Sequence, residues 1–340
     1  MVPAKKLAAT AIALSAAGLA GRVALRLSAD AIKSRRDPDL DPLYEVPPDV
    51  AEHFVAAADG GTIHVLERGS GRPLLLIHGI TLQAGVWAPQ LHGLADRYRV
   101  LAIDVRGHGL SKAGSGGFGR KVAARDVKSV LEHFDLRGAV VVGHSMGGMI
   151  VMEFAGDFPD VLDERVAGLV FMDTAAYQVA PKVVLPVAKA LGGRLVRRLD
   201  EGRPVPARHI GDDDLSWVMT RLAFGNKPPA RAVDQTRRFA AEVPQATSLP
   251  SGIDLLDHDA RKALAATRTP SMVLVGSRDL LTPVYAARRI ASFLPHARFE
   301  VLPGAGHQIM QERPAEFARL LDEFVAGLDA PERVAGRRGG

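Results

Sequence analysis

The chain contains no cysteine, and this absence excludes disulfide bonds, thiolate zinc sites and a cysteine nucleophile together. It does not choose between redox compartments. The chain also lacks a full-length apolar span near its start, because the uncharged stretch from Leu7 to Gly21 has only fifteen residues. A helix that crosses a bilayer needs about 20.

Charge is nearly balanced outside the N-terminal segment. Residues 1–36 hold seven basic groups and one acid, whereas the rest of the chain holds 36 basic and 37 acidic residues. The net charge of +5 therefore comes from the N-terminus. A body without a basic excess argues against nucleic acid as a partner.

The N-terminal segment has a composition typical of export or membrane attachment. Lys5 and Lys6 precede the apolar stretch, whose length suits the hydrophobic region of a signal peptide. If Arg22 and Arg26 snorkel, the helix could reach Leu27 and act as an uncleaved anchor. An alanine-rich amphipathic helix packed on the body is the alternative. We expect a membrane-associated or exported protein, with a cytoplasmic location as the alternative.

Pattern changes along the chain predict its domain organisation. A proline-rich stretch of alternating charge reads as an extended linker, and the apolar content of 47% supports a substantial core. One long interval has short helical patterns and no buried strand, which predicts a lid over a site or an inert packing module. The expected parts are a basic apolar segment 1–36, a linker 37–52, a core 53–173 and 270–327, a helical cap 174–269 and a disordered tail 328–340.

The core alternates buried strands with helical patterns. A hairpin signal around an Asp-Gly-Gly turn in residues 53–68 is followed by continuous apolar runs, each of which ends in polar residues or glycine. This alternation predicts an α/β fold with a doubly wound, mainly parallel sheet of about eight strands. The expected buried strands lie in residues 73–79, 98–109, 139–145, 166–173, 270–279 and 297–307.

One strand-to-helix junction reads Gly143-His144-Ser145-Met146-Gly147, a G-x-S-x-G pattern. The chain must reverse sharply there, which places Ser145 in a strained conformation with its hydroxyl exposed. The start of the following helix favours developing negative charge, and the Met146 N–H would be one donor to an oxyanion. The alternative role for Ser145 is that of a helix N-cap.

A nucleophilic serine needs a base, and the base needs an acid to orient it. His307 follows the last predicted strand, and Asp279 follows the strand before it. The order Ser145, Asp279, His307 is the order of an α/β-hydrolase triad. Asp173, after the strand that precedes the cap, competes with Asp279 for the role of the acid.

From about residue 53 to 327 the chain resembles the α/β-hydrolase superfamily, in particular its serine-nucleophile members with a helical cap, which are esterase- and lipase-like. His78-Gly79 at the end of a buried strand matches the family's HG motif, and the resemblance implies that the Ile80 N–H is the second oxyanion donor. The loop "DVRGHGLS" at residues 104–111 also matches, in a part that the family uses mainly for structure.

This pattern predicts a serine hydrolase that cleaves a carboxylic ester or related acyl bond through an acyl-enzyme intermediate, with no cofactor and no metal. The expected partner is a small apolar ester-like molecule. Carbon–carbon bond hydrolysis and cofactor-free haloperoxidation use the same triad and stay open, as does a catalytically silent, membrane-tethered binding protein. The sequence does not identify the substrate. Candidate pocket residues, which could equally be core, are Leu82, Trp87, Trp217 and Phe224.

Two other groups of polar residues have simpler interpretations. Asp212, Asp213 and Asp214 precede a helical pattern, so we expect them to cap that helix and favour its dipole. Several histidines show no pairing pattern and are expected at the surface: His92, His133, His209, His258 and His296.

Overall fold

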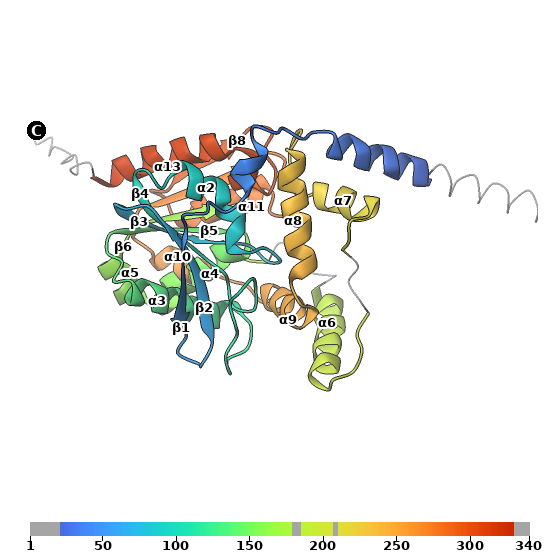
Figure 1. Cartoon of the computed structure of the whole chain (residues 1–340). Helices are drawn as coiled ribbons and strands as arrows, with labels where there is room; N and C mark the ends of the chain where they lie inside the picture. Colours follow the sequence, from blue (N-terminus) through green and yellow to red (C-terminus); the bar gives the residue numbers. More distant parts are fainter. Residues whose placement is uncertain (1–20, 179–184, 207–209, 330–340) are drawn as a thin grey trace, which may run out of the picture.

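The computed structural model describes residues 21–178, 185–206 and 210–329 (Figure 1). Eight strands form one sheet in the order β1-β2-β4-β3-β5-β6-β7-β8. The pairs β1–β2 and β2–β4 are antiparallel and all others are parallel. The predicted α/β fold is thus confirmed. The strands are β1 (Ala51–Ala56), β2 (Thr62–Arg68), β3 (Arg72–Ile77), β4 (Tyr98–Ile103), β5 (Ala139–His144), β6 (Val166–Met172), β7 (Ser271–Gly276) and β8 (Arg298–Leu302).

Helices cover both faces of the sheet, because parallel strands are apolar on both sides and must be buried on both. Two apolar clusters, one on each face, contain the fully buried side chains of the central strands. One face carries α3 (Arg120–His133), α4 (Met146–Asp157), α5 (Pro159–Arg165), α10 (Arg261–Ala266) and α11 (Val284–Phe293). The other carries η2 (Ala84–Trp87), α2 (Ala88–Gly93), α12 (Ile309–Glu312) and α13 (Pro314–Asp329).

The strand order locates the site. The chain runs from β3 outward to β4 and then returns to β5 on the other side of β3. Loops that follow β3 and β5 therefore leave in opposite directions and open a crevice at the carboxyl edge of the sheet. Ligands bind at such a switch point in open α/β sheets.

In the segment between β6 and β7 the described residues form five helices, of which α10 packs on the sheet and the other four, α6 to α9, stand beside it in Figure 1. Its two ends meet where it leaves and rejoins the core. Tyr177 and Asp259 form an antiparallel bridge, and the Ala260 N–H donates to the Ala176 carbonyl at 2.8 Å. The four helices beside the sheet are α6 (Leu185–Asp200), α7 (Asp214–Arg221), α8 (Ala230–Glu242) and α9 (Gln245–Leu255).

His258 corrects an expectation of surface exposure. Its side chain is 2% exposed, and its Nε2 donates to the Ala175 carbonyl at 2.9 Å, at the junction where the cap rejoins the core. A long-range partner, Arg120, donates to its Nδ1. No local sequence pattern encodes that contact. His209 lies outside the described residues.

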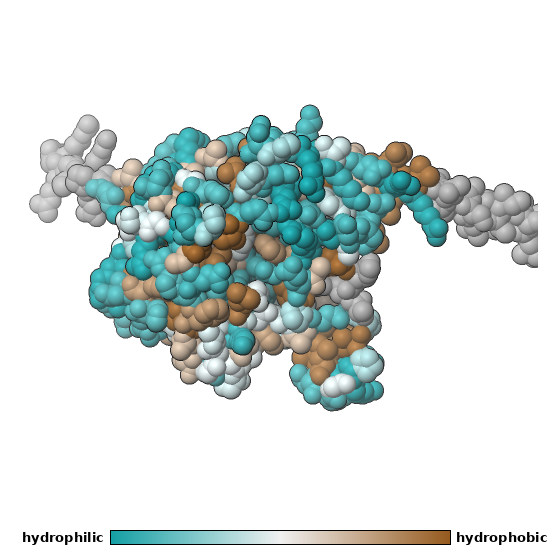
Figure 2. All heavy atoms as spheres, viewed as in Figure 1, coloured by the Kyte–Doolittle hydropathy of each residue, from teal (hydrophilic) through white to brown (hydrophobic). Residues whose placement is uncertain are grey.

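The N-terminal part packs on the cap. Residues 21–33 are helical, and Ala29 and Ile32 are buried against Trp217 and Phe224. On the same helix Val23 and Leu27 are exposed, and Figure 2 shows hydrophobic atoms there beside the grey N-terminal residues. No helix within the described ranges is both long and apolar enough to cross a membrane.

Residues 37–52 are not the extended linker that their prolines predict. They include a 3-10 helix, η1 (Asp41–Tyr44), whose Tyr44 is 3% exposed. The Tyr44 hydroxyl donates to the Gln311 carbonyl at 2.9 Å. The buried Tyr44 therefore fixes this segment to the body of the protein. Composition alone does not reveal that contact.

Candidate active site

Ser145 occupies the corner between β5 and α4 with φ 52° and ψ −117°, a conformation that non-glycine residues rarely adopt. The surrounding chain holds it there. Its N–H donates to the Met172 carbonyl at 3.0 Å, and its carbonyl accepts from the Thr174 hydroxyl at 2.7 Å. Strain that the structure maintains in this way is typical of functional sites.

The glycines of the motif are required by close backbone approach. A Cβ at Gly143 would lie 2.6 Å from the Gly147 carbonyl oxygen, and one at Gly147 would lie 2.2 Å from the Ile77 carbonyl oxygen. A side chain at Gly143 would push α4 away from β5, and one at Gly147 would push it away from the end of β3. The pattern therefore brings the start of α4 against the end of the neighbouring strand.

The loop after β3 lies against Ser145, because a Cβ at Gly79 would come within 3.0 Å of the Ser145 Cβ. Ile80 follows Gly79 in this loop. Met146 is the first residue of α4, so no carbonyl of that helix accepts its N–H. Both expected oxyanion donors thus adjoin the serine.

Two buried histidines shape the loop after β3. His78 Nδ1 donates to the Gly79 carbonyl at 2.7 Å, and its Nε2 accepts from the Val105 N–H at 2.9 Å. His108 Nε2 accepts from the Thr81 N–H at 3.3 Å. Burial lowers the pKa of both, that of His108 to about 4, with His78 as a further cause. Both rings are therefore neutral at pH 7 and can accept these main-chain hydrogen bonds.

Asp279 and His307 are brought together from the ends of β7 and β8. The His307 Nδ1 lies 2.8 Å from the Asp279 Oδ2, and both side chains are buried. Thr282 donates twice to the carboxylate, from its N–H at 2.9 Å and from its hydroxyl at 2.7 Å. Burial opposes ionisation of Asp279, but His307 and the Thr282 donors outweigh it and hold the pKa of this carboxyl below its usual value.

His144, directly before Ser145, connects the β5–α4 corner to the loop after β8 that carries His307, called here the histidine loop. Its Nε2 donates to the His307 carbonyl at 2.7 Å, and the two rings lie 4.9 Å apart. Burial, and then the charge of His307, lower the pKa of His144 to about 3. The three sequence-predicted residues, Ser145, Asp279 and His307, therefore lie on adjoining loops at the carboxyl edge of the sheet.

Asp173, the competing acid, is fully buried at the end of β6 and accepts from the Gly276 N–H at 2.9 Å. Burial, followed by the charge of Asp279, raises its pKa well above the usual value. The carboxylate within hydrogen-bond distance of the His307 ring is that of Asp279.

A family model described as the alpha/beta hydrolase fold matches residues 72–314. The chain belongs to this family. A pimeloyl-[acyl-carrier protein] methyl ester esterase from Aliivibrio salmonicida is 28% identical over 76% of this hydrolase and 92% of its own length.

Solved structures of other proteins also resemble this hydrolase. A thermophilic esterase from Thermogutta terrifontis matches with a TM-score of 0.68 at 25% identity, over 83% of this hydrolase and 100% of that chain. A membrane phospholipase A, described as a bacterial virulence factor, matches with a TM-score of 0.65 at 23% identity. That match covers 96% of this hydrolase and 99% of the phospholipase, so it extends into the segment before β1.

The four candidate pocket residues are core in this hydrolase. Leu82 and Trp87 are buried in the apolar cluster beneath α2 and α13, and Trp217 and Phe224 are buried where the N-terminal helix meets the cap. Asp213 caps α7 as expected, by accepting from the Ser216 N–H. Aromatic residues in a cap therefore do not by themselves indicate a pocket.

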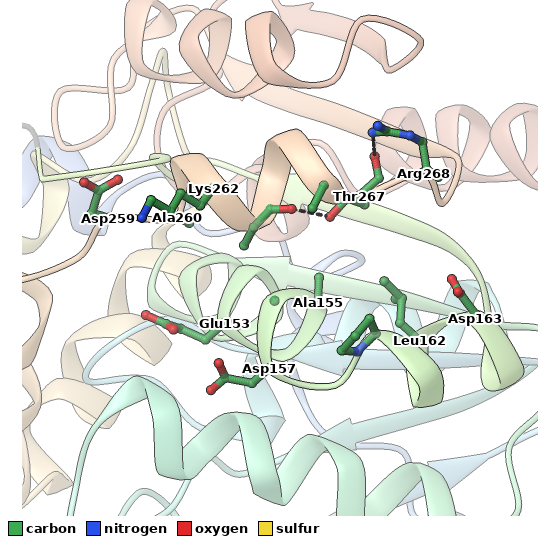
Figure 3. A pocket seen from close by; sticks show the side chains of 14 residues that line it. Glu153, Ala155, Asp157, Leu162, Asp163, Asp259, Ala260, Lys262, Thr267 and Arg268 are labelled. Atoms are coloured by element: carbon green, nitrogen blue, oxygen red, sulfur yellow. Dashed lines mark hydrogen bonds between the residues drawn. The ribbon is translucent and has the colours of Figure 1, made fainter.

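A pocket of about 450 Å³ opens between α4 and α5 on one side and α10 on the other (Figure 3). Its lining includes Glu153 and Asp157, at the end of α4 that is farthest from Ser145. Twelve helical residues rise about 18 Å. This pocket therefore lies away from the triad.

Sequence reasoning missed Glu312, a buried carboxylate in α12. It accepts from the Gly306 N–H at 2.8 Å, directly before His307, and from the Gly225 N–H of the cap at 2.7 Å. Only its position, five residues after His307, hinted at a role near the site. Its partners are main-chain groups, which leave no sequence signature.

Proposed function

We propose that this hydrolase cleaves carboxylic esters through an acyl-enzyme on Ser145. The observation that carries the proposal is the hydrogen bond between Asp279 and His307, whose loop is joined through His144 to a serine held at positive φ. An imidazole oriented by a carboxylate is the base that a serine hydroxyl needs. The esterases among its relatives and structural neighbours support the same reaction class.

In the proposed reaction, the Ser145 Oγ attacks the ester carbonyl and its proton passes to the His307 Nε2. Asp279 holds the ring with its Nδ1–H toward the carboxylate and stabilises the imidazolium. The carbon–oxygen bond to the leaving alkoxide breaks, and the imidazolium supplies the proton that makes it an alcohol. Water then attacks the acyl-enzyme with His307 as base, which frees the carboxylic acid and restores Ser145.

The N–H groups of Ile80 and Met146 stabilise the oxyanion of each tetrahedral intermediate. Donors of this kind are worth about 3 kcal/mol each, because they are already oriented when charge develops. The neutral rings of His78 and His108 keep the loop after β3 in place for this task.

A panel of p-nitrophenyl esters of increasing acyl length tests the reaction and its substrate class. We expect hydrolysis by the unaltered protein, none by Ser145→Ala, and normal rates in Ser292→Ala, which removes an exposed serine on α11. A fluorophosphonate probe should label the protein only when Ser145 is present. Absence of both hydrolysis and labelling would favour a silent binding protein, whereas labelling without ester hydrolysis would favour carbon–carbon hydrolysis or haloperoxidation.

We further propose that residues 1–36 attach the enzyme to a membrane or direct its export. The support is their basic and apolar composition, together with a structural neighbour that is a membrane phospholipase A and matches into this segment. An amphiphilic ester would suit an enzyme at such a surface, and longer acyl chains in the panel test that extension.

A further inference from the structure

The loop that carries His307 rests on the cap loop of residues 223–226, which follows α7. The His307 N–H donates to the Ala223 carbonyl at 2.8 Å, and the Asn226 N–H donates to the Gly304 carbonyl at 2.7 Å. These are main-chain contacts between segments about 80 residues apart in the sequence. The backbone of the proposed catalytic base is therefore attached to the cap as well as to the core.

Two glycines allow this attachment. A Cβ at Gly225 would lie 2.0 Å from the Gly304 carbonyl oxygen, and one at Gly306 would lie 2.3 Å from the Gly225 nitrogen. The two loops thus meet backbone to backbone with no room for a side chain. A cap loop so close to the histidine loop cannot move without displacing it.

Glu312 connects the same two loops from α12. Its Oε1 accepts from the Gly306 N–H at 2.8 Å and from the Gln308 N–H at 3.4 Å. It therefore binds the main chain on both sides of His307. Its Oε2 accepts from the Gly225 N–H at 2.7 Å. The side chain is 5% exposed. Main-chain donors from two loops satisfy its oxygens and offset part of the cost of burial, which still raises the pKa of this carboxyl.

We propose that Glu312 is a positioning residue that fixes the His307 backbone and makes the placement of that histidine depend on the docked cap loop. The inference rests on the proposed function, because it assigns His307 the role of base. The Asp279 contact orients the ring, whereas Glu312 determines where the ring is anchored.

The expected kinetic signature follows from this division of roles. His307 acts when the proton moves, so a displaced backbone should lower kcat and leave KM nearly unchanged. A displacement on the order of 1 Å costs roughly 100-fold. Glutamine keeps one acceptor oxygen and alanine keeps none, so activity should fall in the order Glu312, Glu312→Gln, Glu312→Ala.

The test compares these two variants with Glu316→Gln, which removes a surface carboxylate four residues further along the chain, in α13. We expect kcat to fall about 10- to 100-fold in Glu312→Gln, with KM within about twofold and slower fluorophosphonate labelling. Hydrogen exchange should rise in residues 302–308 and 222–227 together, and in the N–H groups of Ser277 and Arg278 that donate to the same loop, and stay unchanged in α3. Glu316→Gln should match the unaltered protein in every measurement.

Unchanged kcat with raised exchange would overturn the proposal, because Glu312 would then be a structural link only. Raised exchange throughout the chain, or a rise in KM without a fall in kcat, would overturn it as well. If Glu312→Ala fails to fold, the nearly isosteric glutamine variant carries the test. Failure of the proposed function would appear in the unaltered protein, as absent labelling and hydrolysis, whereas the link between the loops is measured by exchange.

Discussion

At the residue scale, Asp173 and Asp279 follow neighbouring parallel strands, yet their surroundings favour different charge states. The Asp279 carboxylate accepts hydrogen bonds from the His307 ring and from the N–H and hydroxyl of Thr282, which stabilise its charge despite burial. Asp173 is fully buried, receives the Gly276 N–H and faces the charge of Asp279. The local donors, more than burial, decide which aspartate can support an imidazolium.

We expect Asp279→Asn to lower kcat by roughly 10⁴-fold, because an amide favours the wrong tautomer of His307. Asp173→Asn should lower kcat far less, since its carboxyl is not the one bonded to the ring. Steady-state kinetics on an ester substrate, with circular dichroism as the check on folding, compares them. An inactive Asp173→Asn beside an active Asp279→Asn would reverse the assignment.

Asp173→Asn should also stabilise the folded protein relative to the unaltered one, and this stabilisation should grow as the pH rises. A buried acid whose pKa is raised in the folded state favours folding below its unfolded pKa, about 3.9, and loses that contribution as the pH rises toward the folded pKa. The asparagine does not titrate, and its oxygen can still accept from the Gly276 N–H. Relative to the unaltered protein, its free energy of unfolding should gain roughly 1.4 kcal/mol for each pH unit in that window. Urea unfolding at pH 4 and pH 7 measures this difference, and an equal difference at both values would contradict it.

At the element scale, Arg120 at the start of α3 connects the cap to the core. Its guanidinium donates to Asp254 on α9 at 2.8 Å, to Glu153 on α4 at 2.6 Å and to the His258 Nδ1 at 2.7 Å. Burial, and then the charge of Arg120, lower the pKa of His258 to about 4. The neutral ring accepts from Arg120 on one side and donates to the cap junction on the other.

Arg120→Met should therefore destabilise the protein by about 2 kcal/mol, because it leaves the buried His258 and the half-buried Glu153 and Asp254 without the guanidinium. Arg125→Met, an exposed arginine on the same helix, is the matched control and should cost less than about 0.5 kcal/mol. Urea unfolding of both variants measures these values. A loss as small in Arg120→Met as in the control would show that other contacts hold the cap.

The same elements show how much of the fold was predictable. Continuous apolar runs identified the buried strands, and the order of Ser145, Asp279 and His307 placed those residues at strand ends that share one edge. Burial of Tyr44, His258 and Glu312 could not be predicted, because their partners are main-chain groups or distant side chains that local periodicity does not record.

At the scale of the whole molecule, the N-terminal helix of residues 21–33 is packed against the cap. Ala29 and Ile32 are buried on the cap, and the Ala230 N–H at the start of α8 donates to the Arg35 carbonyl at 3.1 Å. A truncation that tests location must leave these contacts intact. Removal of residues 1–20 alone meets this condition.

We expect full-length protein to fractionate with membranes or outside the cytosol, and the Δ1–20 form to be recovered in the soluble cytosolic fraction with its ester hydrolysis intact. The reason is that the first twenty residues carry Lys5, Lys6 and most of the apolar run, and the packed helix remains. Immunoblotting of fractions from cells that express each tagged form measures this. Recovery of both forms in the soluble cytosol would contradict the proposal.

The two ends of the cap leave and rejoin the core side by side, joined by main-chain hydrogen bonds at Ala176–Ala260 and Gln178–His258. For a segment whose ends already meet, added length costs little: each doubling of a flexible loop adds only about 0.6 kcal/mol of closure entropy. The core can therefore tolerate caps of very different size at this junction. Selectivity for new substrates could then arise by exchange of the inserted segment, provided that the replacement again supplies a carbonyl for the His307 N–H.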